Sequence, residues 1–204
     1  IRERSQPCCG MEACERPQPQ VQFNVVEVLR IAEELEHKAA KFYLLAAERF
    51  SDPERRTICY NLAAWRARRQ QAWARIRREY SERTGEFGTF DPDNYVLSNP
   101  QVMASLTCFA TRPGAQDWPA GRETPEQIVR DAIHRAGDIV IFYHGLKGFA
   151  QNFESDRMID RLIDREERHI RQLRNSLQQM RSRSSGVSSS HLLPNARLAL
   201  AGTC

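Results

Sequence analysis

The sequence predicts an all-α fold, a bundle of four helices made of two repeated helical hairpins with a long crossover between helices two and three. The first observation is a repeat at an offset of one hundred residues, in which Phe42-Tyr43 recurs as Phe142-Tyr143. The second is the spacing of apolar residues by three and four along four long segments, which is typical of amphipathic helices. The third is the segment 85–123, in which glycines and prolines are too frequent for a long helix.

The first hairpin is expected over residues 22–83. One helical stripe runs along residues 22–50 and comprises Val25, Leu29, Ala32, Glu36, Ala39, Tyr43 and Ala46. Asp52 and Pro53 then mark a stop and a restart, because an aspartate cap followed by proline suits the first turn of a helix. The second helix is expected to reach about Arg83 and to turn inward Ile58, Leu62, Trp65, Arg69, Trp73 and Ile76.

The second hairpin begins after the crossover, within which residues 100–109 are expected to form a short helix. Thr124, Pro125 and Gln127 form a strong start signal: a threonine cap, proline at the first position and glutamine at the third. The third helix is expected to run to about Ala150, and the fourth from about Ser155 to about Met180.

The length and composition fit one domain with a substantial core. The absence of a long apolar run and of a signal pattern leads us to expect a cytoplasmic protein with no membrane partner. We expect a disordered leader over residues 1–20, the bundle over 21–182 and a flexible serine-rich tail over 183–204. Whether residues 1–10 belong to the natural protein is left open, because the first methionine is Met11.

The repeat also reveals a partly preserved motif. The second copy carries Glu166 and His169 in the pattern Glu-x-x-His, whereas the first copy has Arg66 and Arg69 at the matching positions. On the first helix Glu36 stands seven residues before Tyr43. The matching position before Tyr143 is Ala136.

These motifs resemble those of the rubrerythrin-like branch of the ferritin-like superfamily. The resemblance covers roughly residues 22–180, apart from the crossover. It implies a ferritin-like four-helix bundle in which each hairpin supplies Glu-x-x-x-x-x-x-Tyr and Glu-x-x-His, and in which six side chains hold two irons that react with peroxide or oxygen. Residue by residue, Glu36 matches the first-helix carboxylate, Glu166 and His169 match the fourth-helix pair, and Tyr43 and Tyr143 match the family's tyrosines.

The chain departs from the family pattern at three of the six ligand positions, where it has Arg66, Arg69 and Ala136. The 204 residues contain no Cys-x-x-Cys pair, so we do not expect the carboxy-terminal rubredoxin domain of full-length rubrerythrins. Arginine is always protonated and has no lone pair to give a metal. Two arginines would balance the charges of Glu36 and Glu166, so we expect salt bridges between them in a metal-free polar core.

Three functional hypotheses follow. The first is a degenerate rubrerythrin-like protein, a homodimer without catalytic residues or a cofactor, that serves as a binding or structural module. The alternative is an oxidoreductase acting on peroxide or oxygen, with one iron or manganese held by Glu36, Glu166 and His169. The second alternative is an anion or nucleic-acid binder that uses helix two, which has nine arginines against three glutamates over residues 54–83.

For several other residues we expect no functional role. Arginine is frequent throughout the chain, so we do not expect nucleic acid as a partner, and we expect most of the arginines of helix two to be solvated. Tyr43 and Tyr143 are expected to be core aromatic residues with their hydroxyls near the polar centre. Off the inward stripes, His37, His134 and His144 are expected to be exposed. The six cysteines show no metal-site spacing: Cys8, Cys9, Cys14, Cys59, Cys108 and Cys204.

Overall fold

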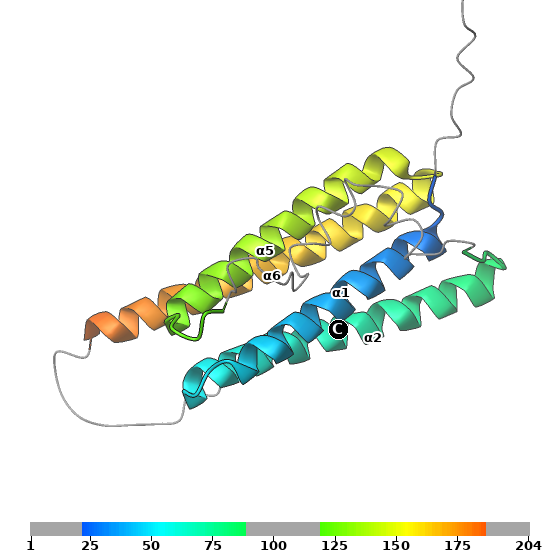
Figure 1. The fold of residues 1–204 in the computed structure, drawn as a ribbon. Coiled ribbons are helices and arrows are strands. Elements are labelled where there is room, and N and C mark those ends of the chain that lie inside the picture. The colour runs from blue at the N-terminus through cyan, green and yellow to red at the C-terminus, as the bar shows by residue number, and fades with distance from the viewer. Residues whose placement is uncertain (1–21, 89–118, 187–204) are drawn as a thin grey trace, which may run out of the picture.

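The computed structural model describes residues 22–88 and 119–186, and both parts are helical (Figure 1). In chain order the elements are α1 (Val25–Glu48), α2 (Pro53–Thr84), α5 (Pro125–Leu146), the short 3₁₀ helix η2 (Lys147–Phe149) and α6 (Phe153–Gly186). Among the described residues the only β-type pairing is an isolated bridge between Phe23 and Ala150. The predicted all-α bundle of four long helices is therefore confirmed in this part of the chain.

The helices begin at side chains that cap their free backbone N–H groups. At α1, Asn24 accepts from the N–H of Glu27 while Glu27 accepts from that of Asn24. Thr124 and Gln127 form the same reciprocal box at the start of α5, as the sequence predicts. Asp52 caps α2 by accepting from the N–H of Arg55 at 2.9 Å. Gly85 ends α2 with a φ of 70°, a left-handed conformation that favours glycine.

The four helices pack as two antiparallel hairpins, α1 with α2 and α5 with α6 (Figure 1). Asn24, at the start of α1, donates to the carbonyl of Phe87 beyond the end of α2. Arg49, just past the end of α1, donates to the carbonyl of Pro119 shortly before α5. Thus α2 ends and α5 begins at opposite ends of the bundle, and the two helices run in the same direction. This arrangement accounts for the long connection between residues 85 and 124.

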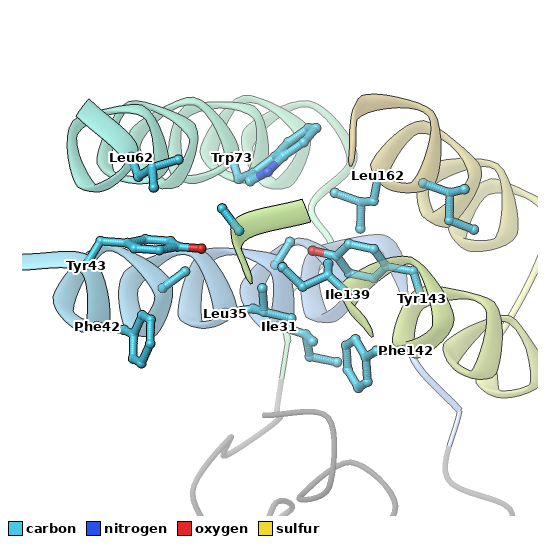
Figure 2. Close-up of a cluster of buried hydrophobic side chains, with 14 of the residues drawn as sticks. Ile31, Leu35, Phe42, Tyr43, Leu62, Trp73, Ile139, Phe142, Tyr143 and Leu162 are labelled. Carbon is cyan, nitrogen blue, oxygen red and sulfur yellow. The ribbon is translucent and has the colours of Figure 1, made fainter. Parts of the chain in front are cut away.

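The predicted apolar stripes form the core between the hairpins. All residues of the stripe expected on α1 are buried. On α2 the prediction holds for Ile58, Leu62, Arg69 and Trp73. Ile76 is only partly buried but packs against the core, as expected, whereas Trp65 is partly buried and does not belong to the core cluster. Figure 2 shows the two Phe-Tyr pairs of the repeat entering the core from α1 and α5.

Some predicted boundaries need correction. The helix predicted to reach Ala150 ends at Leu146 and is followed by the 3₁₀ turn η2. The last helix extends to Gly186, beyond the predicted end at Met180 and beyond the expected domain boundary at residue 182. It starts at Phe153 because Asn152 accepts from the N–H of Ser155 at 2.9 Å and caps the first turn.

Three expectations concern residues outside the described ranges: the leader over 1–20, the short helix over 100–109, and residues 187–204 of the tail. A search of the described helices finds none with a stretch long and apolar enough to span a membrane.

Candidate functional site: a buried ring of arginines and carboxylates

Four charged side chains from three helices meet in the middle of the bundle. Glu36 comes from α1, Arg66 and Arg69 come from α2, and Glu166 comes from α6. The two carboxylates are 0 % exposed, and the arginines are 1 % and 5 % exposed. Each lies on the buried face of its helix, because spacings of three and seven residues repeat a helical face. The predicted convergence of these four residues is confirmed.

The four side chains form a closed ring in which each arginine bridges both carboxylates. Arg66 Nη1 lies 3.2 Å from Glu36 Oε2, and Arg66 Nη2 lies 2.8 Å from Glu166 Oε1. Arg69 Nε lies 2.8 Å from Glu36 Oε1, and Arg69 Nη1 lies 3.1 Å from Glu166 Oε2. All four carboxylate oxygens therefore contact a guanidinium nitrogen. This confirms the predicted arginine–carboxylate salt bridges.

The two arginines differ in how well they are aligned with the carboxylates. Both contacts of Arg66 have hydrogen-bond geometry. The contacts of Arg69 are equally close, but the directions of its N–H groups do not meet the requirements of a hydrogen bond. Arg66 is therefore the directional anchor of the ring, while Arg69 contributes mainly charge.

Burial and charge act in opposite directions on the ring. Burial lowers the pKa of Arg66, but the charges of Glu166 and Glu36 outweigh it, and the pKa rises above its ordinary value. For Glu36 burial is the larger effect and raises the pKa, although Arg69 and Arg66 oppose the rise. A charged Arg66 needs both carboxylates as counter-charges, since an uncompensated buried cation is strongly unfavourable. We therefore describe the ring as two guanidinium ions facing two carboxylates.

His169 joins this cluster through an aromatic contact. It is 1 % exposed, and its ring stacks on Trp65 with 3.4 Å between centroids and 12° between planes. Burial lowers the pKa of His169 well below its ordinary value, and the charges of Arg66 and Arg69 lower it further. The imidazole is therefore neutral at physiological pH. Its Nδ1 has no hydrogen-bond partner among the described residues.

Two tryptophans line the ring from α2. The guanidinium carbons of Arg66 and Arg69 lie 4.9 and 4.7 Å from the ring centroid of Trp65, within the range of a cation–π contact. Arg69 also lies 5.6 Å from the ring of Trp73. Trp65, which we expected to be an ordinary inward residue, instead forms a partly exposed cover over the two arginines and His169. The signal for this role was its position directly before Arg66 and four residues before Arg69.

The two repeated tyrosines approach the ring from opposite sides. Tyr43 and Tyr143 are both 0 % exposed, and their hydroxyls point toward the middle of the bundle (Figure 2). Burial raises the pKa of each hydroxyl. Each tyrosine also packs against the phenylalanine that precedes it, with ring centroids 5.2 Å apart in the first copy and 5.6 Å in the second. Their predicted place as core aromatic residues beside the polar centre is confirmed.

The remaining predicted positions fall as the periodicity indicates. Ala136, where the family pattern has a carboxylate, is buried and 0 % exposed. His37, His134 and His144 are exposed.

The residues present do not fit a di-iron centre. In the described part of the chain no group of three or more His, Cys, Asp or Glu side chains is arranged to hold a metal ion. The oxygens of Glu36 and Glu166 contact guanidinium groups instead. A metal at this centre would have to displace two cations from both carboxylates, and it would meet their charge repulsion.

Comparison of the chain with protein-family models, with curated proteins and with solved structures finds no match. The resemblance to rubrerythrin-like proteins therefore rests on the sequence motifs alone.

Proposed function

We propose that this protein is a degenerate rubrerythrin-like member of the ferritin-like superfamily that acts as a non-catalytic binding or structural module. The observation that carries the proposal is the closed ring of Arg66, Arg69, Glu36 and Glu166. It occupies the level of the bundle at which the family pattern has its ligands. A cytoplasmic location and a homodimer belong to the same proposal.

The ring can replace a metal centre because both supply positive charge to buried carboxylates. Buried carboxylates need positive charge nearby, which a di-iron protein supplies with metal ions. Here two guanidinium groups supply it, and their planar forks suit bidentate contact with carboxylates. Replacing a buried ion network by apolar residues is often neutral for stability, so the role proposed for the ring is to fix the register in which α1, α2 and α6 pack.

The alternative function, a residual metal-dependent oxidoreductase, is favoured by one observation. His169 is buried and neutral, and its Nδ1 has no hydrogen-bond partner among the described residues. A neutral imidazole nitrogen is a common metal ligand. Glu36 and Glu166 are engaged by the arginines, however, so His169 has no free carboxylate beside it in the ring, and the metal-free proposal is the better supported.

Metal content and peroxide turnover test the proposal directly. Full-length protein would be purified from cells grown with added iron or manganese and measured by elemental analysis, and peroxide consumption would be followed with a suitable electron donor. We expect well under two metal ions per chain and no appreciable peroxide-dependent turnover. Two irons per chain, or metal-dependent turnover abolished by His169→Gln, would contradict the proposal and favour the oxidoreductase.

The outer face of α5 supports the proposed homodimer. Ile141 is 70 % exposed there, with Gly137 and Gly145 one helical turn to either side. A Cβ added at either glycine would meet nothing within 4 Å, so packing within the chain does not require glycine there. Alanine would favour the helix by about 1 kcal/mol at such a position. Small residues around an exposed apolar side chain allow a second helix to approach closely.

The dimer is tested by light scattering coupled to gel filtration. Ile141→Arg should convert a dimer to a monomer, because the new charge would be buried in the contact. Phe153→Arg is the matched control, since Phe153 is 72 % exposed and lies on another helix, at the start of α6. A monomeric wild-type protein, or a dimer unaffected by Ile141→Arg, would rule out this interface.

A further inference from the structure

The charge of α6 changes abruptly after Glu167. Up to that point the helix mixes acidic and basic residues, whereas residues 168–204 contain six arginines and no aspartate or glutamate. Such an asymmetry within one helix is a signal of an interaction with an anionic partner.

The structure describes five of these arginines and places them on the outside of the bundle. The α6 basic face consists of five exposed side chains: Arg168, Arg171, Arg174, Arg181 and Arg183. The opposite face of the same stretch buries Leu173 and Leu177 in the core, so the helix cannot turn these arginines inward.

The first three arginines of this face have little counter-charge. For these three arginines the described part of the chain provides one ion pair, which joins Arg171 to Glu167 at 3.7 Å with both side chains well exposed. Such an exposed pair is weak, and a partner can readily replace it. For Arg168 and Arg174 the described residues provide no carboxylate within ion-pair distance.

A helix-terminus effect does not explain this face. Basic residues stabilise a helix C-terminus through the macrodipole, but only within about the last turn. Arg168, Arg171 and Arg174 lie about three turns or more before Gly186, where α6 ends.

Fewer arginines of α2 are available to bind a partner than its sequence suggests. Arg66 and Arg69 are buried in the ring, and Arg77 pairs with Glu33. The surface of α2 is therefore less basic than its sequence suggests, and α6 presents the denser positive charge.

We propose that the α6 basic face binds the phosphate backbone of nucleic acid. Arginine forks bind phosphate in a bidentate manner. The side chains exposed between them are hydrogen-bonding amides and a hydroxyl: Gln172, Asn175, Gln178, Gln179 and Ser182. A membrane-surface helix would carry apolar side chains for insertion, and none is exposed between Arg168 and Arg183.

The test measures binding of the full chain to fluorescein-labelled duplex DNA of mixed sequence and to single-stranded RNA of the same length, by anisotropy over a series of NaCl concentrations. Two variants carry the same change of charge. One replaces Arg168, Arg171 and Arg174 by glutamate. The matched control replaces Arg68, Arg75 and Arg78 of α2, which are also exposed. Circular dichroism melts establish that both are folded.

We expect wild type and the α2 variant to bind at low salt, with log Kd linear in log salt concentration. The α6 variant should bind at least about tenfold more weakly to duplex DNA, and its salt slope should fall by about three or more. The proposal is overturned if neither nucleic acid binds at low salt, or if both variants lose affinity equally, because net charge would then be the cause. Equal binding to phosphatidylserine vesicles, or displacement of the nucleic acid by poly-glutamate at equal charge, would overturn it in favour of a membrane or an acidic protein.

Discussion

Trp65 and His169 stack face to face at 3.4 Å, and this contact joins α2 to α6 directly beside the buried ring. The tryptophan lies one residue before Arg66, and the histidine lies three residues after Glu166. One turn of α2 and one of α6 therefore carry the aromatic cover and three of the four ring residues, and Glu36 of α1 supplies the fourth. The four ring residues are buried, whereas Trp65 beside them is only partly buried. The indole of Trp65 therefore lies between the ring and solvent.

The ring makes a clear prediction about Arg69. Replacing it with alanine leaves carboxylate oxygens of Glu36 and Glu166 without their partner in a buried site. We expect Arg69→Ala to lower the free energy of unfolding by about 3–5 kcal/mol, measured by urea denaturation. The neighbouring Arg68→Ala is the control, because Arg68 is exposed. Its effect should stay within about 0.5 kcal/mol. Similar small effects of both substitutions would mean that the ring contributes nothing to folding.

His169 should make the protein sensitive to acid. Burial and the charges of Arg66 and Arg69 lower its pKa in the folded state, whereas the unfolded chain binds a proton near pH 6.5. Its contribution to stability is complete above that pH. As the pH falls below about 6.5 the unfolded state takes up a proton that the folded state does not, and stability drops by up to about 1.4 kcal/mol per pH unit.

This pH effect is measured as a difference between variants in denaturation curves from pH 7.5 to 5. His169→Gln should flatten the curve below about pH 6.5, while His134→Gln, at an exposed position, should leave it unchanged. An unchanged curve for His169→Gln would show that His169 becomes protonated in the folded protein.

Cys59 is predicted to be chemically inert in the folded state. Its side chain is 0 % exposed, and burial raises the pKa of the thiol to about 12. In a variant with the other five cysteines changed to serine, a thiol-specific reagent at pH 8 should label Cys59 only after denaturant is added. Rapid labelling without denaturant would mean that the start of α2 opens readily.

Much of the fold could be predicted because the helical signals are local. The caps at Asp52 and Thr124 and the buried stripe of α1 each depend on residues close together in the chain. The end of α6 was missed because residues 181–186 continue a helix without the apolar spacing that signals one. The partial exposure of Trp65 depends on which helix lies beside it, and the spacing of α2 alone does not encode that.

The candidate site was predictable because of the repeat. The matching phase of Arg66 and Glu166 at an offset of one hundred residues placed both on inward faces. The closed geometry was not predictable, since it depends on how the arginine side chains extend between two hairpins. The stack of Trp65 on His169 likewise depends on the packing of α2 against α6.

The central claim is that arginines replace a metal centre. Its most direct test introduces the family's ligand pattern into this chain and measures whether metal binds. The variant combines Arg66→Glu, Arg69→His and Ala136→Glu. Its apo form should be less stable than wild type, because carboxylates without counter-charges then cluster in the core.

Thermal melts of wild type and of this triple variant, each with a chelator and with excess manganous or ferrous ion, decide the matter. We predict that metal raises the melting temperature of the variant by about 5 °C or more, as expected for ligand binding at about one hundred times its Kd, and leaves wild type unchanged. A metal-dependent rise in wild type with none in the triple variant would contradict the account, and it would identify Glu36, Glu166 and His169 as a working metal site.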